Sequence, residues 1–166
     1  PVDSLPIAVQ DQFLSTNMQS VQVDSMLYLM GGYGYMNSLA MHSTHGRITA
    51  IHVPQMIAAI QQGNGAAARA AIRTWADPRF AWTGGVAREL NGQVFLAGGQ
   101  FFHGSYNPMG PNHGPGFSQN YHDGYVHFSL VDDGDSLAVM NFTSVTDSAL
   151  MHRRDYNMTH TVDPST

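Results

Sequence analysis

Alternating apolar and polar residues over short stretches predict β-strands along much of this 166-residue chain. In SVQVDSMLYLMGG, residues 20–32, a strand of mixed character reaches a turn near Asp24-Ser25, and a more apolar strand then ends at Gly-Gly. ARELNGQVFLAGG, residues 87–99, repeats this pattern with Asn91-Gly92, the favoured pair for a tight two-residue turn. Both stretches therefore predict antiparallel hairpins.

The two hairpins belong to a longer internal repeat. Residues 15–35 align without a gap with residues 82–102, at an offset of 67. Each copy then reaches a second apolar run that begins with glycine, GRITAIHV at Gly46 and GYVHFSLV at Gly124, at an offset of 78. SLAVMNFTS, residues 136–144, predicts a further strand. Two copies whose insertions are confined to loops indicate a repeat architecture of all-β class.

Two segments depart from the strand pattern. Residues 54–76 are rich in Ala, Gln, Ile and Arg and carry a first-turn proline, and a Gly-Asn-Gly sequence interrupts them, so they predict two short helices inserted between β units. We interpret this insertion as a structural addition to a loop that packs against the β units. Residues 103–123 have almost no strand character, and a loop of this length is usually functional or packed on the surface.

The order of apolar strand, Gly-Gly, variable loop and further strand resembles a kelch repeat. YNPM (106–109) and HRRDYN (152–157) are similar to segments of secreted bacterial kelch-type propellers, although the tryptophan of kelch blades is absent. The resemblance implies a partial kelch-like β-propeller of four-stranded antiparallel blades, divergent from the typical repeat. We expect a single partial propeller over residues 1–166, with a blade at about 12–53, the helical insertion at 54–76, a blade at about 78–145 containing the long loop 103–123, and a polar tail at 146–166.

A kelch-type blade has about 50 residues, and propellers close with roughly four to eight blades. The chain supplies at most about three blades on this basis. The resemblance therefore implies that the chain is part of a larger propeller or assembly, with the remaining blades or another protein chain as partners. The first ten residues lack the basic and apolar regions of a signal peptide, so we expect a mature, processed or internal piece of an extracellular or cell-surface protein.

Composition narrows the classes of function. The net charge is −5 with no basic cluster, which argues against nucleic acid as a partner. Cys and Lys are both absent, which excludes zinc–thiolate sites, cysteine nucleophiles and Schiff-base lysines. No apolar run is long enough to predict a membrane span.

The Tyr, Asn and His residues of the long loop are suited to hydrogen bonding and stacking against carbohydrate or protein. In HRRDYN, paired arginines suggest a clamp for a carboxylate or a sialic-acid-like ligand, or alternatively charge-assisted ties between blades. The candidate ligand-binding residues are Tyr106, Asn107, His113, Tyr121, His122, Arg153 and Arg154.

The sequence DDGDS suggests a weak calcium site formed by Asp132, Asp133 and Asp135, because calcium prefers oxygen-rich loops. The alternative is a solvated hairpin turn, since Asp and Gly are also favoured there. No other cofactor is predicted.

These observations favour a non-catalytic binding or scaffold module. The alternative is a fragment of a carbohydrate-active kelch-type enzyme, similar to a sialic-acid mutarotase, whose catalytic residues lie partly on other blades. The chain has one glutamate, Glu89, beside a predicted turn, and the sequence assigns no catalytic residue. Location of Arg153, Arg154 and Asp155 at a central cavity would favour the enzyme, and burial of these residues between blades would favour the scaffold.

Overall fold

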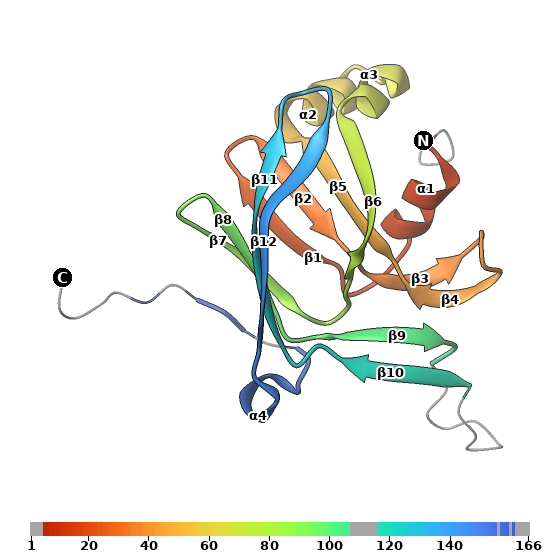
Figure 1. Ribbon diagram of the computed structural model, residues 1–166. Helices are drawn as coiled ribbons and strands as arrows, with labels where there is room; N and C mark the ends of the chain where they lie inside the picture. The colour runs from red at the N-terminus through yellow and green to blue at the C-terminus, as the bar shows by residue number, and fades with distance from the viewer. Residues whose placement is uncertain (1–4, 107–115, 156, 160, 162–166) are drawn as a thin grey trace.

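The computed structural model describes residues 5–106, 116–155, 157–159 and 161. Twelve strands and four short helices are found in these residues, in the order shown in Figure 1. The strands are β1 (Gln19–Val23), β2 (Met26–Met30), β3 (Tyr33–Met36), β4 (Met41–Thr44), β5 (Gly46–His52), β6 (Ile72–Ala81), β7 (Val86–Leu90), β8 (Gln93–Ala97), β9 (Gln100–Gly104), β10 (Phe117–Tyr121), β11 (Gly124–Asp132) and β12 (Leu137–Thr146). The helices are α1 (Ile7–Phe13), α2 (Val53–Gln61), α3 (Gly65–Ala70) and α4 (Ser148–Met151).

The described strands form three four-stranded antiparallel sheets, which confirms the predicted all-β class. The N-terminal sheet has the order β1-β2-β5-β6, and the C-terminal sheet has the order β12-β11-β8-β7. A third sheet, the bridging sheet, has the order β10-β9-β4-β3 and extends to one side of the other two (Figure 1). This arrangement is compatible with a propeller-like fold.

The sequence repeat is also a structural repeat. Strand β7 begins 67 positions after β1, and both copies pass from the first to the second strand through a two-residue turn, as predicted. The amide of Gly31 donates to the carbonyl of Arg47 at 3.0 Å, and Gly98 donates to Gly124 at 3.1 Å. The second offset is therefore 77. The predicted offset of 78 is wrong because Gly124 occupies the place of Arg47, and not that of Gly46.

The bridging sheet was not predicted. After its Gly-Gly pair, each copy runs outward as a hairpin, β3-β4 in the first copy and β9-β10 in the second. The two hairpins join where Ser43 pairs with His103, and the Thr44 hydroxyl both donates to the carbonyl and accepts from the amide of Phe102. Strands β9 and β10 therefore occupy both ends of the segment 103–123, which sequence patterning treats as almost free of strand.

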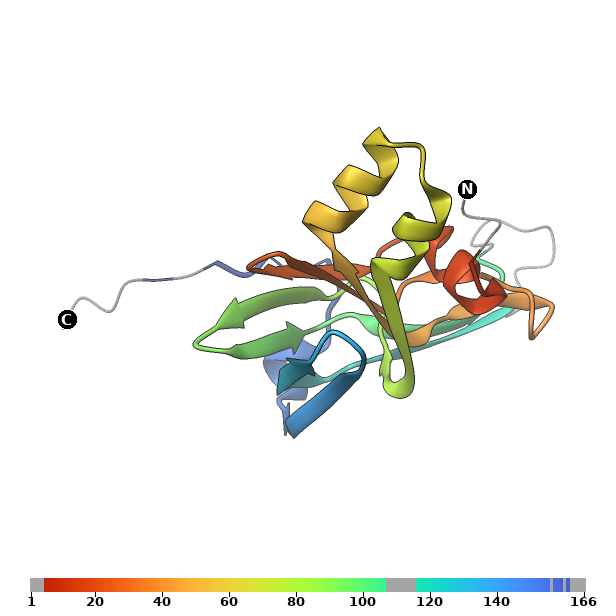
Figure 2. The same ribbon diagram turned by 90° about the horizontal axis from the view of Figure 1, so that it is seen from above.

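The helical insertion predicted at about 54–76 is present as helices α2 and α3, which project beyond the ends of strands β5 and β6 (Figures 1 and 2). The side chains of His52 and Asn64 cap the two helices by accepting from the amides of Gln55 and Ala67. Residues 72–76 already belong to β6, because Ile72-Arg73-Thr74-Trp75 pairs with β5 and its β-branched and aromatic side chains suit a strand.

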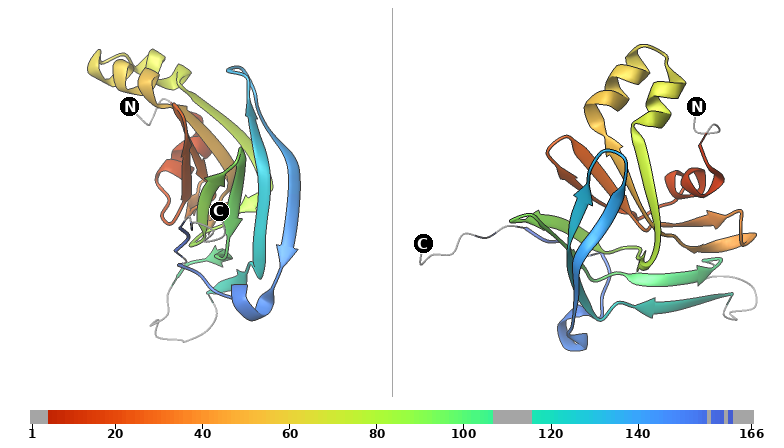
Figure 3. Two further views of the ribbon diagram at one scale, coloured as in Figure 1. Left: turned by 90° about the vertical axis from the view of Figure 1, so that its left-hand side faces the viewer. Right: turned by 45° about the horizontal axis from the view of Figure 1, so that its top comes forward.

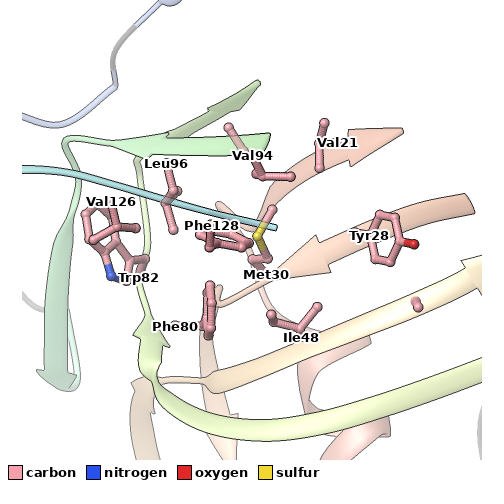
Figure 4. Close-up of a cluster of buried hydrophobic side chains, with 12 residues drawn as sticks. Val21, Tyr28, Met30, Ile48, Phe80, Trp82, Val94, Leu96, Val126 and Phe128 are labelled. Atoms are coloured by element: carbon pink, nitrogen blue, oxygen red, sulfur yellow. The ribbon is translucent and has the colours of Figure 1, made fainter. Parts of the chain in front are cut away.

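The core lies between the N-terminal and C-terminal sheets, which are stacked in Figures 2 and 3. Phe80 and Phe128 are fully buried and meet edge to face, with ring centroids 4.9 Å apart. Figure 4 shows these rings surrounded by aliphatic side chains from both sheets. The core cluster consists of Val21, Tyr28, Met30, Ile48, Ala50, Phe80, Trp82, Ala87, Val94, Leu96, Val126 and Phe128.

The N-terminal and C-terminal sheets pack through faces that are not equivalent in the repeat. Tyr28 and Ile48 point from the N-terminal sheet into the core. Their counterparts in the repeat, Phe95 and Tyr125, lie on the outer face of the C-terminal sheet, because successive side chains of a strand alternate between faces. The inward residues of the C-terminal sheet, such as Leu96, come from the opposite face of the repeat. A sandwich with two-fold symmetry would bring equivalent faces together, so this interface is heterologous.

A partly buried ion pair ties strand β6, at the edge of the N-terminal sheet, to strand β11, in the interior of the C-terminal sheet. Both carboxylate oxygens of Asp132 on β11 accept from the Arg73 guanidinium on β6 at 2.5 Å. The hydroxyl of Tyr28 on β2 also bonds to Asp132, and burial together with this carboxylate raises the pKa of Tyr28. The three side chains thus form one polar contact at the margin of an apolar core.

Each Gly-Gly pair accommodates the backbone that enters the following unit. The amide of Gly32 donates to the carbonyl of Trp82 at 2.8 Å, and a Cβ on Gly31 would lie 2.0 Å from the same oxygen. The second pair repeats this contact, because the amide of Gly99 donates to the carbonyl of Arg153 at 2.8 Å. Only glycine permits this approach of two backbones together with a positive φ.

We predict that Gly99→Ala is much more destabilising than Gly92→Ala. Both residues have φ of 78°, so both substitutions carry the strain of a left-handed conformation, about 1–2 kcal/mol. A Cβ on Gly99 would also lie 2.6 Å from the amide nitrogen of Gly85, whereas nothing lies within 4 Å of one on Gly92. Urea unfolding measures both changes, and equal losses of stability would show that the sheet junction tolerates a side chain.

Candidate functional site

A pocket of about 300 Å³ opens where the bridging sheet meets the starts of the repeat units. The pocket has polar and aromatic walls. Its lining residues are Thr16, Asn17, Tyr33, Thr83, Gly84, Gln100, Phe102, Tyr106, Arg154 and Asp155. We take this pocket as the candidate functional site because it brings together residues 16–17, 83–84 and 154–155, which are distant in the sequence, with Gln100 and Phe102 of strand β9.

The aromatic wall is held in place by hydrogen bonds and ring contacts. The Tyr33 hydroxyl donates to the carbonyl of Gly104 at 2.6 Å and accepts from the amide of Tyr106 at 3.1 Å. Phe102 meets the rings of Tyr33 and Tyr106 edge to face, at centroid distances of 5.1 and 5.7 Å. A flat or partly apolar ligand face therefore meets rings whose positions are already fixed.

The polar wall comes from equivalent positions of the repeat. The backbone of Thr16 pairs with that of Tyr33, and the backbone of Thr83 pairs with that of Gln100, 67 positions further along. The Thr83 hydroxyl donates to the carbonyl of Asn17 at 3.4 Å. The repeat thus places two threonine hydroxyls and an amide side chain at one opening, where they can bind the hydroxyl groups of a ligand.

Arg154 and Asp155 complete the pocket. The amide of Asp155 donates to the carbonyl of Gly84 at 2.7 Å, which fixes the backbone of this segment. The Arg154 guanidinium lies 3.5 Å from the Asp155 carboxylate, and these side chains are 41% and 68% exposed. An exposed ion pair of this length contributes little to stability. The guanidinium can therefore turn to a carboxylate on a ligand, with which it can form a paired hydrogen bond.

The structure brings together only two of the predicted ligand-binding residues, Tyr106 and Arg154. Arg153 is exposed and is held through its carbonyl at Gly99. Asn107 and His113 lie outside the described residues. The other two predicted residues do not line this pocket: Tyr121 is absent from its walls, and His122 lines a separate, smaller pocket beside Trp82.

His122 instead packs against the core. Its ring stacks on Trp82 at a centroid distance of 3.8 Å, and its Nε2 lies 3.2 Å from the carbonyl of Ala81. Burial lowers the pKa of His122, because the charged imidazolium is disfavoured there. Tyr121 packs on His152, whose Nδ1 lies 2.6 Å from the carboxylate of Asp123.

The predicted calcium ligands are occupied by other contacts. Asp132 is paired with Arg73, and the carboxylate of Asp133 accepts from the amides of Asp135 and Ser136. These contacts are those of an Asp-rich hairpin turn. In the part of the chain that the structure describes, no group of three His, Asp or Glu side chains is arranged to hold a metal ion. The structure therefore lends the calcium hypothesis no support.

Sequence reasoning did not identify most of the pocket. Thr16, Tyr33, Thr83, Gln100 and Phe102 are strand-end or link residues that carry no motif of their own. The one available signal was the alignment of the repeat, which places Thr16 on Thr83 next to the Gly-Gly pairs. The residues at the start of each copy meet at the pocket through tertiary contacts, which the alignment alone does not show.

Comparison with models of known protein families finds no matching family, and comparison with curated proteins finds no significant match. Among the described residues, no helix has the length and apolar character needed to cross a bilayer.

We predict that the free energy of unfolding falls as the pH drops below about 6.5, the ordinary pKa of histidine. Burial lowers the pKa of both His45 and His122, so the folded state favours their neutral forms. Their contribution is present above the unfolded pKa and is lost as the pH falls through the folded pKa. His122→Gln should flatten this acid branch in denaturant titrations. Identical acid branches for wild type and His122→Gln would contradict the prediction.

We also predict that Asp132→Asn lowers the free energy of unfolding by about 3 kcal/mol, because it leaves the Arg73 guanidinium partly buried without its counter-charge. Asp135→Asn, in the same turn, is the control and should have almost no effect. Thermal melts with and without calcium chloride check the alternative. A melting temperature that rises with calcium in wild type and not in Asp132→Asn would reinstate the calcium site.

Proposed function

We propose that the protein is a non-catalytic, extracellular binding or scaffold module built from divergent kelch-like blades, which forms part of a larger propeller or assembly. We further propose that its pocket binds a small ligand that carries a carboxylate and hydroxyl groups, such as a sialic-acid-like sugar. The observation that carries this proposal is the pocket, whose lining combines the exposed Arg154 guanidinium with Tyr106 and the two threonines Thr16 and Thr83.

The sheet packing supports the propeller part of the proposal. Blades of a propeller are arranged around an axis, so each blade turns one face to the blade before it and the other face to the blade after it. The N-terminal and C-terminal sheets have this relation, with Tyr28 inward in one copy and its counterpart Phe95 outward in the next. The bridging sheet is an addition that typical kelch blades do not require.

The alternative function is a carbohydrate-active enzyme of the sialic-acid mutarotase type. Arg154 and Asp155 at the pocket favour this alternative. Asp155 is the one carboxylate among the described lining residues, so the pocket lacks the carboxylate pair that most glycoside hydrolases use. Interconversion of sugar anomers needs no such pair, and it is therefore the reaction that distinguishes the enzyme alternative from binding alone.

We predict that N-acetylneuraminic acid binds the protein and that its methyl ester binds about tenfold more weakly. The ester removes the charge that the Arg154 guanidinium would pair with, and a hydrogen bond between charged groups is worth about 1.5–3 kcal/mol. Arg154→Gln should weaken binding of the acid by about the same factor, and Arg154→Lys should restore part of it. Isothermal titration calorimetry measures each affinity.

Arg153→Gln is the matched control, since it removes the same charge from the neighbouring residue, which does not line the pocket. Equal losses of affinity in both variants would show that the effect is general electrostatic attraction and not a contact inside the pocket. Equal binding of acid and ester would exclude carboxylate recognition. Exchange spectroscopy of the two anomers tests the enzyme alternative, because a mutarotase would accelerate their interconversion and a binding module would not.

A further inference from the structure

Gln100 is an enclosed polar residue in the wall of the pocket. Only 4% of its surface is exposed, although it begins strand β9 and lines the opening. Its side-chain oxygen Oε1 accepts a hydrogen bond from Nε2 of Gln119 on β10. Among the residues that the structure describes, no acceptor is found for Nε2 of Gln100. A side chain this well enclosed normally has partners at both ends, so its amide hydrogens are available to an acceptor in the pocket.

A chain of polar contacts fixes which end of the Gln100 amide is free. Besides the bond to Gln100, Nε2 of Gln119 donates to the hydroxyl of Tyr121 at 2.9 Å. The register pairs Tyr121 with Gln100 and Gln119 with Phe102, so these four side chains lie on one face of the bridging sheet. The ring of Tyr121 packs in turn on His152. Both hydrogens of Gln119 Nε2 are thus used, and Gln100 presents a donor to the pocket.

The wall beside Gln100 is apolar. Phe102 follows two residues later on the same face of the sheet, and the rings of Tyr33 and Tyr106 meet it edge to face. The Tyr33 hydroxyl already donates to the carbonyl of Gly104 and accepts from the amide of Tyr106. Tyr33 therefore offers a ligand its ring and not its hydroxyl.

A hydrogen-bond donor beside an apolar wall selects a ligand group that has two parts. A hydroxyl group can accept from the Gln100 amide, but it leaves the neighbouring rings without an apolar contact. An N-acyl group carries a carbonyl acceptor and a small apolar group on the same carbon, so it can satisfy the donor and cover the rings together.

We propose that Gln100 determines the specificity of the pocket by donating from Nε2 to the carbonyl oxygen of an N-acyl group, and that the ligand is an N-acylated acidic sugar. Gln119 is a positioning residue, because it acts on the ligand only through the orientation of Gln100. This inference rests on the ligand part of the proposed function, in which Arg154 binds the carboxylate, and it names a second group that the pocket recognises.

Two acids that differ at one position test the proposal. N-acetylneuraminic acid carries an acetamido group where ketodeoxynononic acid carries a hydroxyl, and both acids keep the carboxylate. Isothermal titration calorimetry gives a Kd for each acid, and the ratio of the two values is the readout. A change of charge near the pocket acts on both acids alike, so the ratio reports the N-acyl contact. We expect N-acetylneuraminic acid to bind the wild-type protein about tenfold more tightly.

Two variants assign this preference to the Gln100 amide. Gln100→Glu keeps the side-chain length and an acceptor for Gln119, but replaces the donor with a second oxygen, so the ratio should fall to about one. Gln119→Met removes the contact that orients Gln100 and should lower the ratio about threefold. This second variant leaves Gln100 in place, so it tests the proposal even where a melting curve shows that Gln100→Glu is unfolded.

Gln61→Glu is the matched control. It makes the same substitution at the exposed end of helix α2, away from the pocket, and should leave the ratio unchanged. A loss of preference in Gln61→Glu equal to that in Gln100→Glu would contradict the assignment to Gln100.

The other outcomes separate this inference from the function on which it rests. Equal affinity of the wild-type protein for the two acids overturns the inference alone, because both acids carry the carboxylate. Tighter binding of ketodeoxynononic acid also overturns it, since a donating hydroxyl would then meet the carbonyl of Gln100. A ratio unchanged in both Gln100→Glu and Gln119→Met places the N-acyl contact elsewhere and overturns it too. If neither acid binds, the ligand part of the proposed function fails and this inference fails with it.

Discussion

The approach of two backbones at each Gly-Gly pair is the constraint on which the rest of the structure depends. At Gly31 the carbonyl of Trp82 occupies the volume that any side chain would need, and the hydrogen bond at Gly32 anchors that carbonyl. This contact fixes the distance and the orientation between one sheet and the next. Burial of the apolar core around Phe80 and Phe128 supplies the driving force, but hydrophobic burial is non-directional, and the junction determines how the sheets are oriented.

The pocket follows from the same junctions. Each unit begins next to the Gly-Gly pair of the unit before it, so residues 16–17, 83–84 and 154–155 gather at one point despite their separation in the chain. The hairpins that leave the Gly-Gly pairs close the pocket from the other side with Tyr33 and Phe102. A pocket thus forms where the architecture itself brings together side chains that are distant in the sequence.

The sequence predicted the parts of this fold that depend on local pattern. Sequence patterning was enough to predict the repeat, the turns at Asp24-Ser25 and Asn91-Gly92, and the apolar strands around them. These features depend on alternation and turn chemistry, which act within a few residues. The bridging sheet could not be predicted in this way, because its short strands β3, β4, β9 and β10 form one sheet only by pairing between the two copies. The same contrast between local pattern and tertiary contact applies to the candidate site. Tyr106 and Arg154 stood out by residue type, whereas Thr16 and Gln100 have a role only through tertiary contact.

The bridging sheet changes how a repeat protein of this kind can unfold. In a linear array each unit touches only its neighbours, so the ends can open while the middle remains folded. Here each copy contributes one hairpin to the bridging sheet, so neither copy forms that sheet alone. The two hairpins join where Ser43 pairs with His103. Opening either copy withdraws half of that sheet from the other. The two units therefore gain or lose their order together, and a duplicated chain acquires the all-or-none behaviour of a single domain.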